Sequence, residues 1–403
     1  MDSALTEFTI ANFRSIYRPQ TIKFNLGEAK TFAIYGQNAS GKSNILKALR
    51  IMTNIIIHSA DASYELPFDF FHYSKTASTK PTIFSIEVKS KRYTLNYTFA
   101  YNQIKILYEV LRQKSDNTNK YKTLFLRKEQ EIINPSAINF GFTPKLIERT
   151  LEKTLLITKA YEDNNPYAKT ILETIHSIEF ASMESRAIEN KVATILDIRP
   201  DIKDKVLNAL SDIEGNIADI KTTHIKLSDS LNEAMNSQSL LRQLLNSYTD
   251  VKIVRKYGET EYHESFNDES SGTRAIISIL TMLQYATENN LMLCMDEFGN
   301  FIHPRNAAKI INYYENLHPR KCFLISTHQL GLYDCIGRAE RIIVSKNHNT
   351  GETRIEQRKA TRNPRALKED RREADNYFIS TKSKNIAEQS SDNKNLFESL
   401  FDF

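Results

Sequence analysis

Cysteine is scarce in this chain of 403 residues, and its scarcity limits the kinds of site the chain can contain. There are only three cysteines, Cys294, Cys322 and Cys335, and none of them has metal-ligand spacing. Two of them lie in apolar, strand-like runs. This argues against a zinc site or a disulfide framework and favours a reduced protein. Residues 1–7 do not resemble a signal peptide, so we expect a cytoplasmic location.

Long hydrophobic runs and a dominant charge are also missing. No apolar run approaches the ~18 residues that a membrane span needs, so we expect no membrane partner. Lysine and arginine number 54 and aspartate and glutamate 49, which gives a net charge of +5. That charge permits DNA or RNA as a partner but does not require it. No a/d heptad persists for three repeats, which argues against a long coiled-coil arm.

The most distinctive stretch present runs from Gly36 to Ser43 and reads Gly-Gln-Asn-Ala-Ser-Gly-Lys-Ser. It fits the phosphate-loop pattern G-x-x-x-x-G-K-[ST] at every defined position. An apolar strand over 31–35 precedes it, and an amphipathic helix over 44–52 follows. A helix N-terminus with free backbone N–H groups favours bound anions. A glycine turn before an ordinary helix is the competing interpretation, and this context disfavours it.

The pattern assigns roles within this phosphate loop. Lys42 is predicted to reach the β- and γ-phosphates of a nucleotide and to take part in catalysis, and Ser43 is predicted to ligate Mg²⁺. The other residues predicted to line the nucleotide are Gly36, Asn38, Ala39, Ser40, Gly41 and Asn44.

A second set of residues follows an apolar strand over 291–295. Asp296 and Glu297 lie at its carboxyl end, where α/β sheets place their ligands. Asp296 is predicted to hold Mg²⁺, and Glu297 is predicted to orient and deprotonate the attacking water. His328 ends another apolar run, over 323–327. A lone histidine is more often structural, but this position favours contact with the γ-phosphate or the water.

A loop of small hydroxylated residues over 269–274 precedes an apolar helical stripe. Such residues at a helix N-terminus can bind an anion, or they can simply cap the helix. The loop alone does not decide between these interpretations.

The order of elements predicts an α/β fold. Residues 82–88, 93–100, 104–112 and 122–127 alternate as an antiparallel β-meander, after a strand over 7–16 paired with 21–24. Residues 143–211 are mainly helical by spacing, with breaks at Pro166 and Pro200, and 229–247 is helical again. Residues 216–227 are strand-like, and 251–266 indicates a hairpin. From 271 onward helices and strands alternate, which favours a mostly parallel sheet. We therefore predict one domain split by a helical insertion, with these parts: 1–135, first half; 136–249, insertion; 250–378, second half; 379–403, polar linker and apolar tail.

These motifs in this order resemble the ABC-type ATPase heads of RecF, the SMC proteins and the OLD-like family. They are most similar to the bacterial "AAA family ATPase" group of anti-phage loci, which includes subunits of RloA-like, Septu-type and PARIS-type systems. The segments that carry the resemblance are 10–16, 36–43, 269–273, 296–304 and 326–329. The resemblance implies a P-loop NTPase of the ABC-ATPase type that hydrolyses ATP with Mg²⁺.

The resemblance further implies a homodimer or higher oligomer that buries two ATP molecules between heads. Ser270 and Gly272, with Ser271 in place of the usual first signature glycine, would then contact the γ-phosphate bound by the partner. Arg14 and Ser15 would lie near the nucleotide of their own subunit. The chain departs from the family in having no convincing glutamine loop, for which Gln103 and Gln113 are poor candidates. In this family an aspartate usually follows the strand that ends in the two acids, here Asp296 and Glu297. Asn300 is the best match to that aspartate in this chain.

On this basis the chain is predicted to be an ATPase that acts as a nucleotide-driven dimerisation switch. The resemblance points to the sensor subunit of an anti-phage system with a separate nuclease or toxin as its effector. A RecF- or SMC-like DNA-binding ATPase of DNA repair or maintenance is the alternative. The β-meander disfavours a transporter subunit. The short segment after the last predicted strand disfavours an ATPase with its own nuclease. The missing Asn-Lys-x-Asp motif disfavours a GTPase. The basic segment 351–372 either contacts nucleic acid or is a solvated surface.

Overall fold

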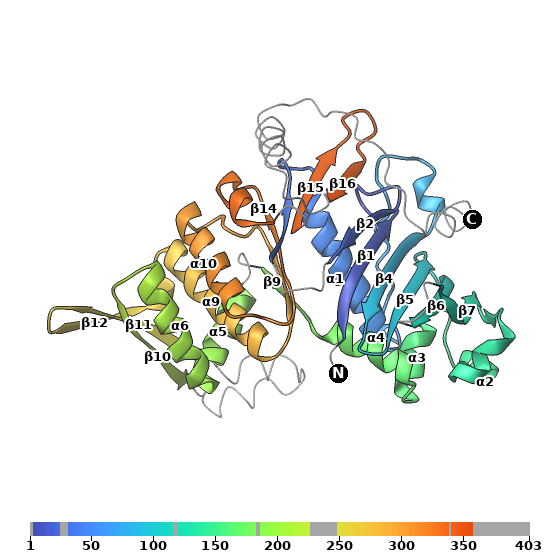
Figure 1. The fold of residues 1–403 in the computed structure, drawn as a ribbon, viewed down its shortest axis with the longest axis horizontal. Coiled ribbons are helices and arrows are strands. Elements are labelled where there is room, and N and C mark those ends of the chain that lie inside the picture. The colour runs from blue at the N-terminus through green and yellow to red at the C-terminus, as the bar shows by residue number, and fades with distance from the viewer. Residues whose placement is uncertain are drawn as a thin grey trace, which may run out of the picture. The chain divides into compact units, whose positions relative to one another are not determined.

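The computed structural model describes residues 3–24, 31–115, 120–182, 186–225, 248–337 and 340–357 (Figure 1). The expected helix over 229–247, most of the basic segment and the apolar tail lie outside these residues. The chain divides into two compact units. The first unit comprises Met1–Glu28, Phe32–Ile178 and Ile336–Phe403, and the second comprises Ala29–Thr31 and Glu179–Cys335.

An antiparallel sheet of seven strands forms the body of the first unit, in the order β2-β1-β4-β5-β6-β7-β8. Aromatic side chains from neighbouring strands, such as Phe8, Phe84 and Phe99, pack together in its core. The predicted meander is confirmed, because residues with a period of two pair in register along it. The strands are β1 (Ala4–Ala11), β2 (Gln20–Lys23), β4 (Thr82–Lys89), β5 (Tyr93–Tyr101), β6 (Ile106–Ser115), β7 (Lys122–Lys128) and β8 (Glu131–Ile132).

The strand, loop and helix expected around the phosphate loop are confirmed in the same unit. Strand β3 (Thr31–Tyr35) is buried along its whole length and is followed by helix α1 (Lys42–His58). Helix α1 packs its apolar stripe on α3 (Leu156–Glu162) and α4 (Pro166–His176). Strand β15 (Arg341–Lys346) runs parallel to β3, and β16 (Thr353–Gln357) pairs antiparallel with β15. Short helices at Ala77–Thr79 (η1), Pro135–Phe140 (η2) and Pro144–Glu148 (α2) complete this unit.

A buried ion pair fastens helix α3 to the sheet. The side chains of Glu109 on β6 and Arg127 on β7 are both 0% exposed, and Arg127 donates to Glu109 over 3.1 Å. Glu109 also accepts hydrogen bonds from the Tyr97 hydroxyl and from the backbone N–H groups of Leu156 and Ile157. These two N–H groups belong to the first turn of α3, so a carboxylate from the sheet caps this helix.

The second unit combines a parallel strand pair with helices. Strand β13 (Met292–Asp296) pairs in parallel with β14 (Phe323–Thr327), and β9 (Ile178–Ser182) follows β13 in the sheet order. Helix α9 (Ser271–Glu288) packs on α5 (Arg186–Ile198) and α6 (Pro200–Ile213). The unit also contains α10 (Pro304–Asn316) and the short helices η3 (Phe266–Asp268) and η4 (Leu330–Cys335).

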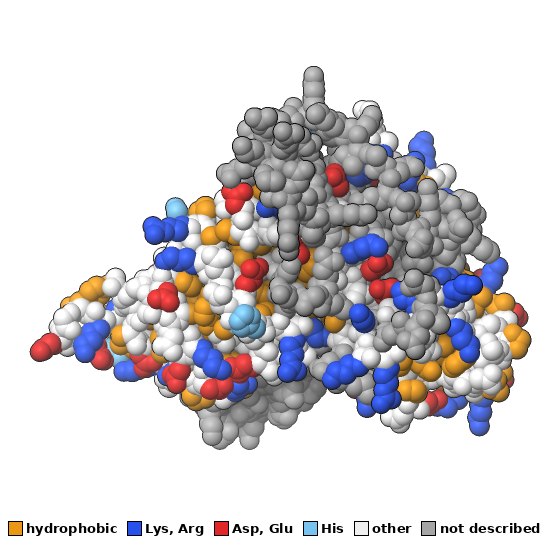
Figure 2. All heavy atoms as spheres, viewed as in Figure 1, with side chains coloured by type: hydrophobic (Ala, Val, Ile, Leu, Met, Phe, Trp, Pro, Cys, Tyr) orange, Lys and Arg blue, Asp and Glu red, His pale blue; other side chains and the backbone are white. Residues whose placement is uncertain are grey.

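A separate antiparallel sheet in this unit has the order β10-β11-β12. Its strands are β10 (Ile217–Ile225), β11 (Tyr248–Tyr257) and β12 (Thr260–Ser265), and the last two form the predicted hairpin. Strand β12 is solvent-exposed, and the face of this hairpin seen in Figure 2 carries acidic, basic and apolar side chains intermixed. The hairpin therefore presents a mixed surface without a charge of one sign.

The predicted α/β class with an antiparallel meander is confirmed. Residues 143–211 are mainly helical, as predicted, but the sequence analysis did not foresee strand β9 at 178–182, which lies beside β13. The helices of the expected insertion also belong to different units, since α2–α4 lie in the first and α5–α6 in the second. The domain boundaries at 135/136, 249/250 and 378/379 stay a prediction. Among the described residues no helix is both long enough and apolar enough to cross a membrane.

Candidate functional site

The phosphate loop connects β3 to α1, and its backbone leaves the start of the helix open. Gly41 precedes α1 with a φ of 108°, and within the described chain no side chain caps this helix. A Cβ at Gly41 would lie 2.9 Å from Ser15 Oγ and closer still to Thr353 Oγ1. Only glycine fits this position. Within the described chain, no capping side chain therefore competes with an anionic ligand for the start of α1.

Lys42 lies folded over this loop. Its Nζ donates to the carbonyl oxygens of Gly36, at 2.8 Å, and Gln37, at 3.0 Å. Asn38, Ala39 and Ser43 are exposed, whereas Ser40 is buried, and its Oγ has no hydrogen-bond partner in the described part of the chain. The Lys42 ammonium group therefore lies beside the uncapped start of α1. There it can exchange its contacts with carbonyl oxygens for contacts with the phosphate oxygens of a ligand.

Three residues from distant segments gather around the loop and around Asn44, which directly follows it. Asn44 donates to Ser15 Oγ over 2.7 Å and accepts from Arg14 over 3.3 Å. Thr353 Oγ1 lies 2.7 Å from Ser15 Oγ and 2.8 Å from the Ser40 carbonyl oxygen. The structure thus brings the predicted residues Arg14, Ser15 and Asn44 together with the phosphate loop. Thr353 was missed by the sequence analysis, because nothing in its local pattern marks it.

Asp69 is the second residue that the sequence analysis missed. It accepts from Arg14 Nε, and its other oxygen lies 2.7 Å from His72 Nε2. Burial alone would raise the pKa of Asp69, but the hydrogen bonds from Arg14 and His72 outweigh it and hold its pKa below the usual range. Asp69 is therefore ionised at neutral pH and keeps the Arg14 side chain beside Asn44.

Replacing Asp69 by asparagine is expected to lower the free energy of unfolding by about 1–2 kcal/mol at pH 7, because a charge-assisted hydrogen bond is lost. The folded-state pKa is lowered, so this stabilisation is present above the unfolded pKa of about 3.9 and is lost as pH falls through the folded value. Urea unfolding of both proteins between pH 2.5 and 7 should show a difference that shrinks only at the acidic end. A difference that does not depend on pH would contradict the ion pair.

The acid strand of the second unit ends as the sequence predicted. Asp296 is the last residue of β13, and its Oδ1 accepts from the hydroxyl of Ser326 on the neighbouring strand β14. The same hydroxyl oxygen accepts from the backbone N–H of Glu297 over 2.9 Å. Ser326 thus fixes the position of both acids. It is a third residue that sequence reasoning did not single out.

Glu297 leaves the strand in a left-handed conformation, with a φ of 56°. This turn places its side chain in solvent, where Oε2 accepts from Asn300 Nδ2 at 2.5 Å. A general base needs an accessible carboxylate of this kind. His328 is also exposed and directly follows β14. Gln329 beside it donates to the carbonyl oxygens of Gly299 and Ile302, and so holds the turn that follows Glu297.

Residues 269–273, which resemble the ABC signature and are called the signature loop here, lead into helix α9. Ser270 is its N-cap and accepts from the backbone N–H of Thr273 over 3.1 Å, with Ser271 and Gly272 in the first turn. Thr273 in turn donates to Glu214 over 2.6 Å. The capping interpretation therefore describes what Ser270 does in this structure. An additional contact of this loop with a partner's phosphate stays a prediction.

Glu269, directly before the cap, forms an ion pair with Arg255 on β11, at 3.0 Å from NH2. Burial alone would raise the pKa of Glu269, but Arg255 holds it below the usual range. The ion pair fixes the backbone that leads into Ser270.

The residues present fit a nucleotide triphosphate and Mg²⁺. The uncapped start of α1, the close packing around Gly41 and the buried, unpartnered Ser40 hydroxyl suit phosphate. Ser43 in the first unit and Asp296 in the second each carry an oxygen donor of the kind that Mg²⁺ prefers. Among the described residues there is no group of three or more His, Cys, Asp and Glu that could hold a metal ion. A Mg²⁺ held by a single carboxylate together with substrate phosphates does not need such a group.

Comparison with known proteins gave one family and several similar structures. Residues 32–334 match the model of a family described as "AAA domain, putative AbiEii toxin, Type IV TA system". The SMC head domain from Thermotoga maritima is 14% identical, with a TM-score of 0.45, over 89% of this chain and 100% of that one. An SMC head domain bound to the C-terminal domain of ScpA, derived from Pyrococcus furiosus, is 13% identical, with a TM-score of 0.44, over 92% and 100%. No curated protein matches the sequence.

Proposed function

Since the chain belongs to this AAA domain family, we propose that it is a Mg²⁺-dependent ATPase in which bound ATP controls association with a second copy. The observation that carries the proposal is the open start of α1, where an uncapped helix and the Lys42 ammonium meet in a phosphate-loop sequence. Anions bind such a helix start through backbone N–H groups and the helix dipole.

In the proposed reaction Lys42 leaves the carbonyl oxygens of Gly36 and Gln37 and contacts the β- and γ-phosphates. Mg²⁺, when bound, neutralises charge on these phosphates, and Ser43 and Asp296 are the residues that would hold it. Glu297 orients the attacking water and accepts its proton. His328 contacts the water or the γ-phosphate. Arg14, kept in place by Asp69, neutralises charge near the nucleotide.

The switch depends on contacts that ATP makes and ADP cannot. Ser270, Ser271 and Gly272 would bind the γ-phosphate held by the second copy, so that ATP favours the associated state. Hydrolysis removes the γ-phosphate that both copies contact, so the associated state loses the contacts that stabilise it. We place this switch in the cytoplasm, in an anti-phage module whose effector is a separate nuclease or toxin. The toxin–antitoxin wording of the family description agrees with such a setting.

Light scattering on the full chain tests the switch. The Glu297→Gln protein is measured with Mg²⁺ and either ATP or ADP, beside the same protein carrying Ser270→Arg. We expect the mass of the Glu297→Gln protein to double or more with ATP but not with ADP. With Ser270→Arg added, we expect the mass in ATP to equal the mass in ADP. A mass that ATP leaves unchanged contradicts the switch. Assembly that survives Ser270→Arg contradicts the role of the signature loop. Thr143→Ala is the control for loss of a helix cap alone, because it removes the side-chain cap of α2 at a cost of about 1 kcal/mol, and it should assemble with ATP as before.

A further inference from the structure

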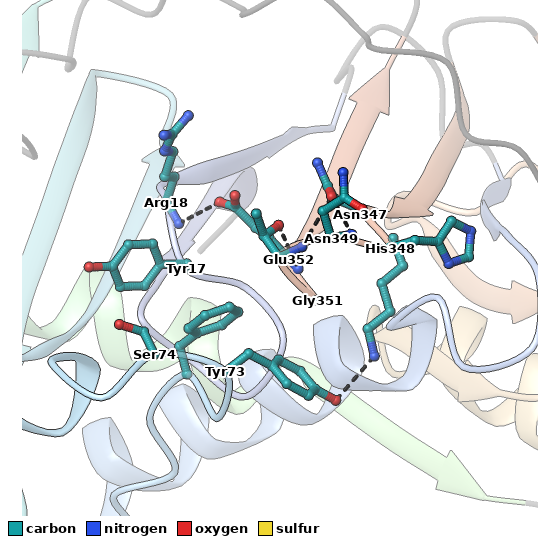
Figure 3. Close-up of a pocket in the computed structure, with 12 residues that line it drawn as sticks. Tyr17, Arg18, Tyr73, Ser74, Asn347, His348, Asn349, Gly351 and Glu352 are labelled. Atoms are coloured by element: carbon teal, nitrogen blue, oxygen red, sulfur yellow. Dashed lines mark hydrogen bonds between the residues drawn. The ribbon is translucent and has the colours of Figure 1, made fainter.

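A pocket of about 740 Å³ lies in the first unit and plays no part in the functions assigned so far. Residues 346–352, at the turn between β15 and β16, line one side (Figure 3). The other side is lined by Tyr17, Arg18, Phe71, Tyr73 and Ser74. Its volume falls within the range of about 300–1,000 Å³ that is typical of small-molecule sites. The pocket is therefore large enough for a nucleoside.

The pocket is connected to the phosphate loop through both of its walls. Tyr17 comes two residues after Ser15, and Glu352 comes directly before Thr353. Ser15 and Thr353 are the two residues whose hydroxyl oxygens approach Gly41. Strand β15 runs parallel to β3, so the turn after β15 and the phosphate loop after β3 leave the sheet at the same edge. Ligands of α/β sheets bind at this edge.

Three aromatic rings follow one another in the pocket wall. The ring centroids of Tyr17 and Phe71 are 4.9 Å apart, and those of Phe71 and Tyr73 are 5.5 Å apart. Phe71 is only 3% exposed and supports the row, whereas Tyr73 is 57% exposed. Lys346 Nζ lies 4.7 Å from the centroid of the Tyr73 ring and donates to its hydroxyl over 3.1 Å. A half-exposed ring on a buried aromatic support is suited to stacking with a planar heterocycle.

The turn opposite is shaped around the same ring. Gly351 has a φ of 70°, and a Cβ there would lie 2.7 Å from two atoms of the Tyr73 ring. The Glu352 carboxylate accepts from the backbone N–H of Arg18 over 3.1 Å and so ties the two walls together (Figure 3). The walls thus hold their spacing without a ligand, which lowers the cost of binding one.

We propose that this pocket binds the base and ribose of the nucleotide whose phosphates lie on the phosphate loop, with the base stacked on Tyr73. The proposal rests on the proposed function, because it requires a nucleotide at the phosphate loop. It adds that the turn between β15 and β16, together with Phe71 and Tyr73, selects the nucleoside. Thr353 then links the nucleoside pocket to the phosphate loop through Ser15 and the Ser40 carbonyl.

The absence of tryptophan from the sequence provides a direct test. Tyr73→Trp, made in the full-length Glu297→Gln protein so that ATP stays intact, introduces a single tryptophan, which can be excited at wavelengths that tyrosine does not absorb. We expect Mg²⁺-ATP to quench or shift its emission and inorganic tripolyphosphate to leave the emission unchanged. Tyr262→Trp is the matched control, since Tyr262 is 50% exposed but lies on β12, and neither ligand should affect it. Equal responses of Tyr73→Trp to ATP and tripolyphosphate, or no response to ATP, overturn the proposal.

Binding constants of the same full chain separate this proposal from the proposed function. Tyr73→Ala should raise the Kd of ATP about fivefold or more and leave the Kd of tripolyphosphate unchanged, because only the stacking contact is lost. Tyr73→Phe should keep the affinity for ATP. Unchanged ATP binding in Tyr73→Ala, beside loss of ATP binding in Lys42→Ala, would overturn the pocket and leave the ATPase standing. ATP binding that survives Lys42→Ala would overturn both.

Discussion

Replacing Glu297 by glutamine is expected to lower the rate of ATP hydrolysis by about 10²- to 10⁴-fold and to leave the Kd of ATP within about twofold. The amide has the size of the carboxylate but cannot accept a proton from water. The side chain is exposed and contacts Asn300 Nδ2, a contact that a glutamine oxygen also accepts. The local fold should therefore survive, and only the chemical step should suffer. Single-turnover hydrolysis and equilibrium ATP binding, measured on the same protein, test this.

The matched control for this change is Glu261→Gln on β12, another exposed glutamate of the same unit. Its hydrolysis rate should equal that of the unchanged protein. If Glu297→Gln hydrolyses ATP at the normal rate, another group is the base. If it loses ATP binding as well, Glu297 acts by shaping the turn over 297–302 and not by accepting a proton.

The parts of the fold that could be predicted are those that short, continuous residue patterns determine. The strand over 31–35 was predicted with the bounds it has, because five buried residues and a glycine loop leave little choice. The meander was also predictable, since its period of two persists over several strands. Strand β9 was not, because five residues inside a helical region carry a weak signal, and the pairing with β13 decides their conformation.

In the candidate site, too, residues in continuous motifs could be predicted, whereas residues brought in by contacts between distant segments could not. Lys42, Asp296 and Glu297 belong to motifs that are continuous in sequence, so their positions at the end of a strand or the start of a helix could be foreseen. Thr353 and Asp69 reach Ser15 and Arg14 across 338 and 55 residues of chain. No local pattern encodes such contacts. They become visible only when the sheets place distant segments side by side.

The second large effect concerns stability. Arg127→Met is expected to lower the free energy of unfolding by about 3–5 kcal/mol, because it leaves the Glu109 carboxylate buried without its cation. Arg127 also donates to the carbonyl oxygens of Thr154 and Glu129, which would lose their partner. Tyr97 cannot compensate. Burial, and then the charge of Glu109, raise its pKa, so its hydroxyl stays protonated and already donates to that carboxylate. Urea unfolding at pH 7 measures the effect.

Two controls show whether the buried charge, and not a lost contact, causes this loss. Lys159→Met breaks the exposed ion pair with Glu162 on α3 and should cost less than about 1 kcal/mol, since water already screens that pair. Adding Glu109→Gln to Arg127→Met removes the stranded charge while keeping an acceptor for one of the two N–H groups, since Leu156 donates to Oε2 and Ile157 to Oε1. The double variant should therefore be more stable than Arg127→Met alone. If it is less stable, the loss comes from packing, and α3 is held to the sheet by shape and not by the carboxylate that caps it.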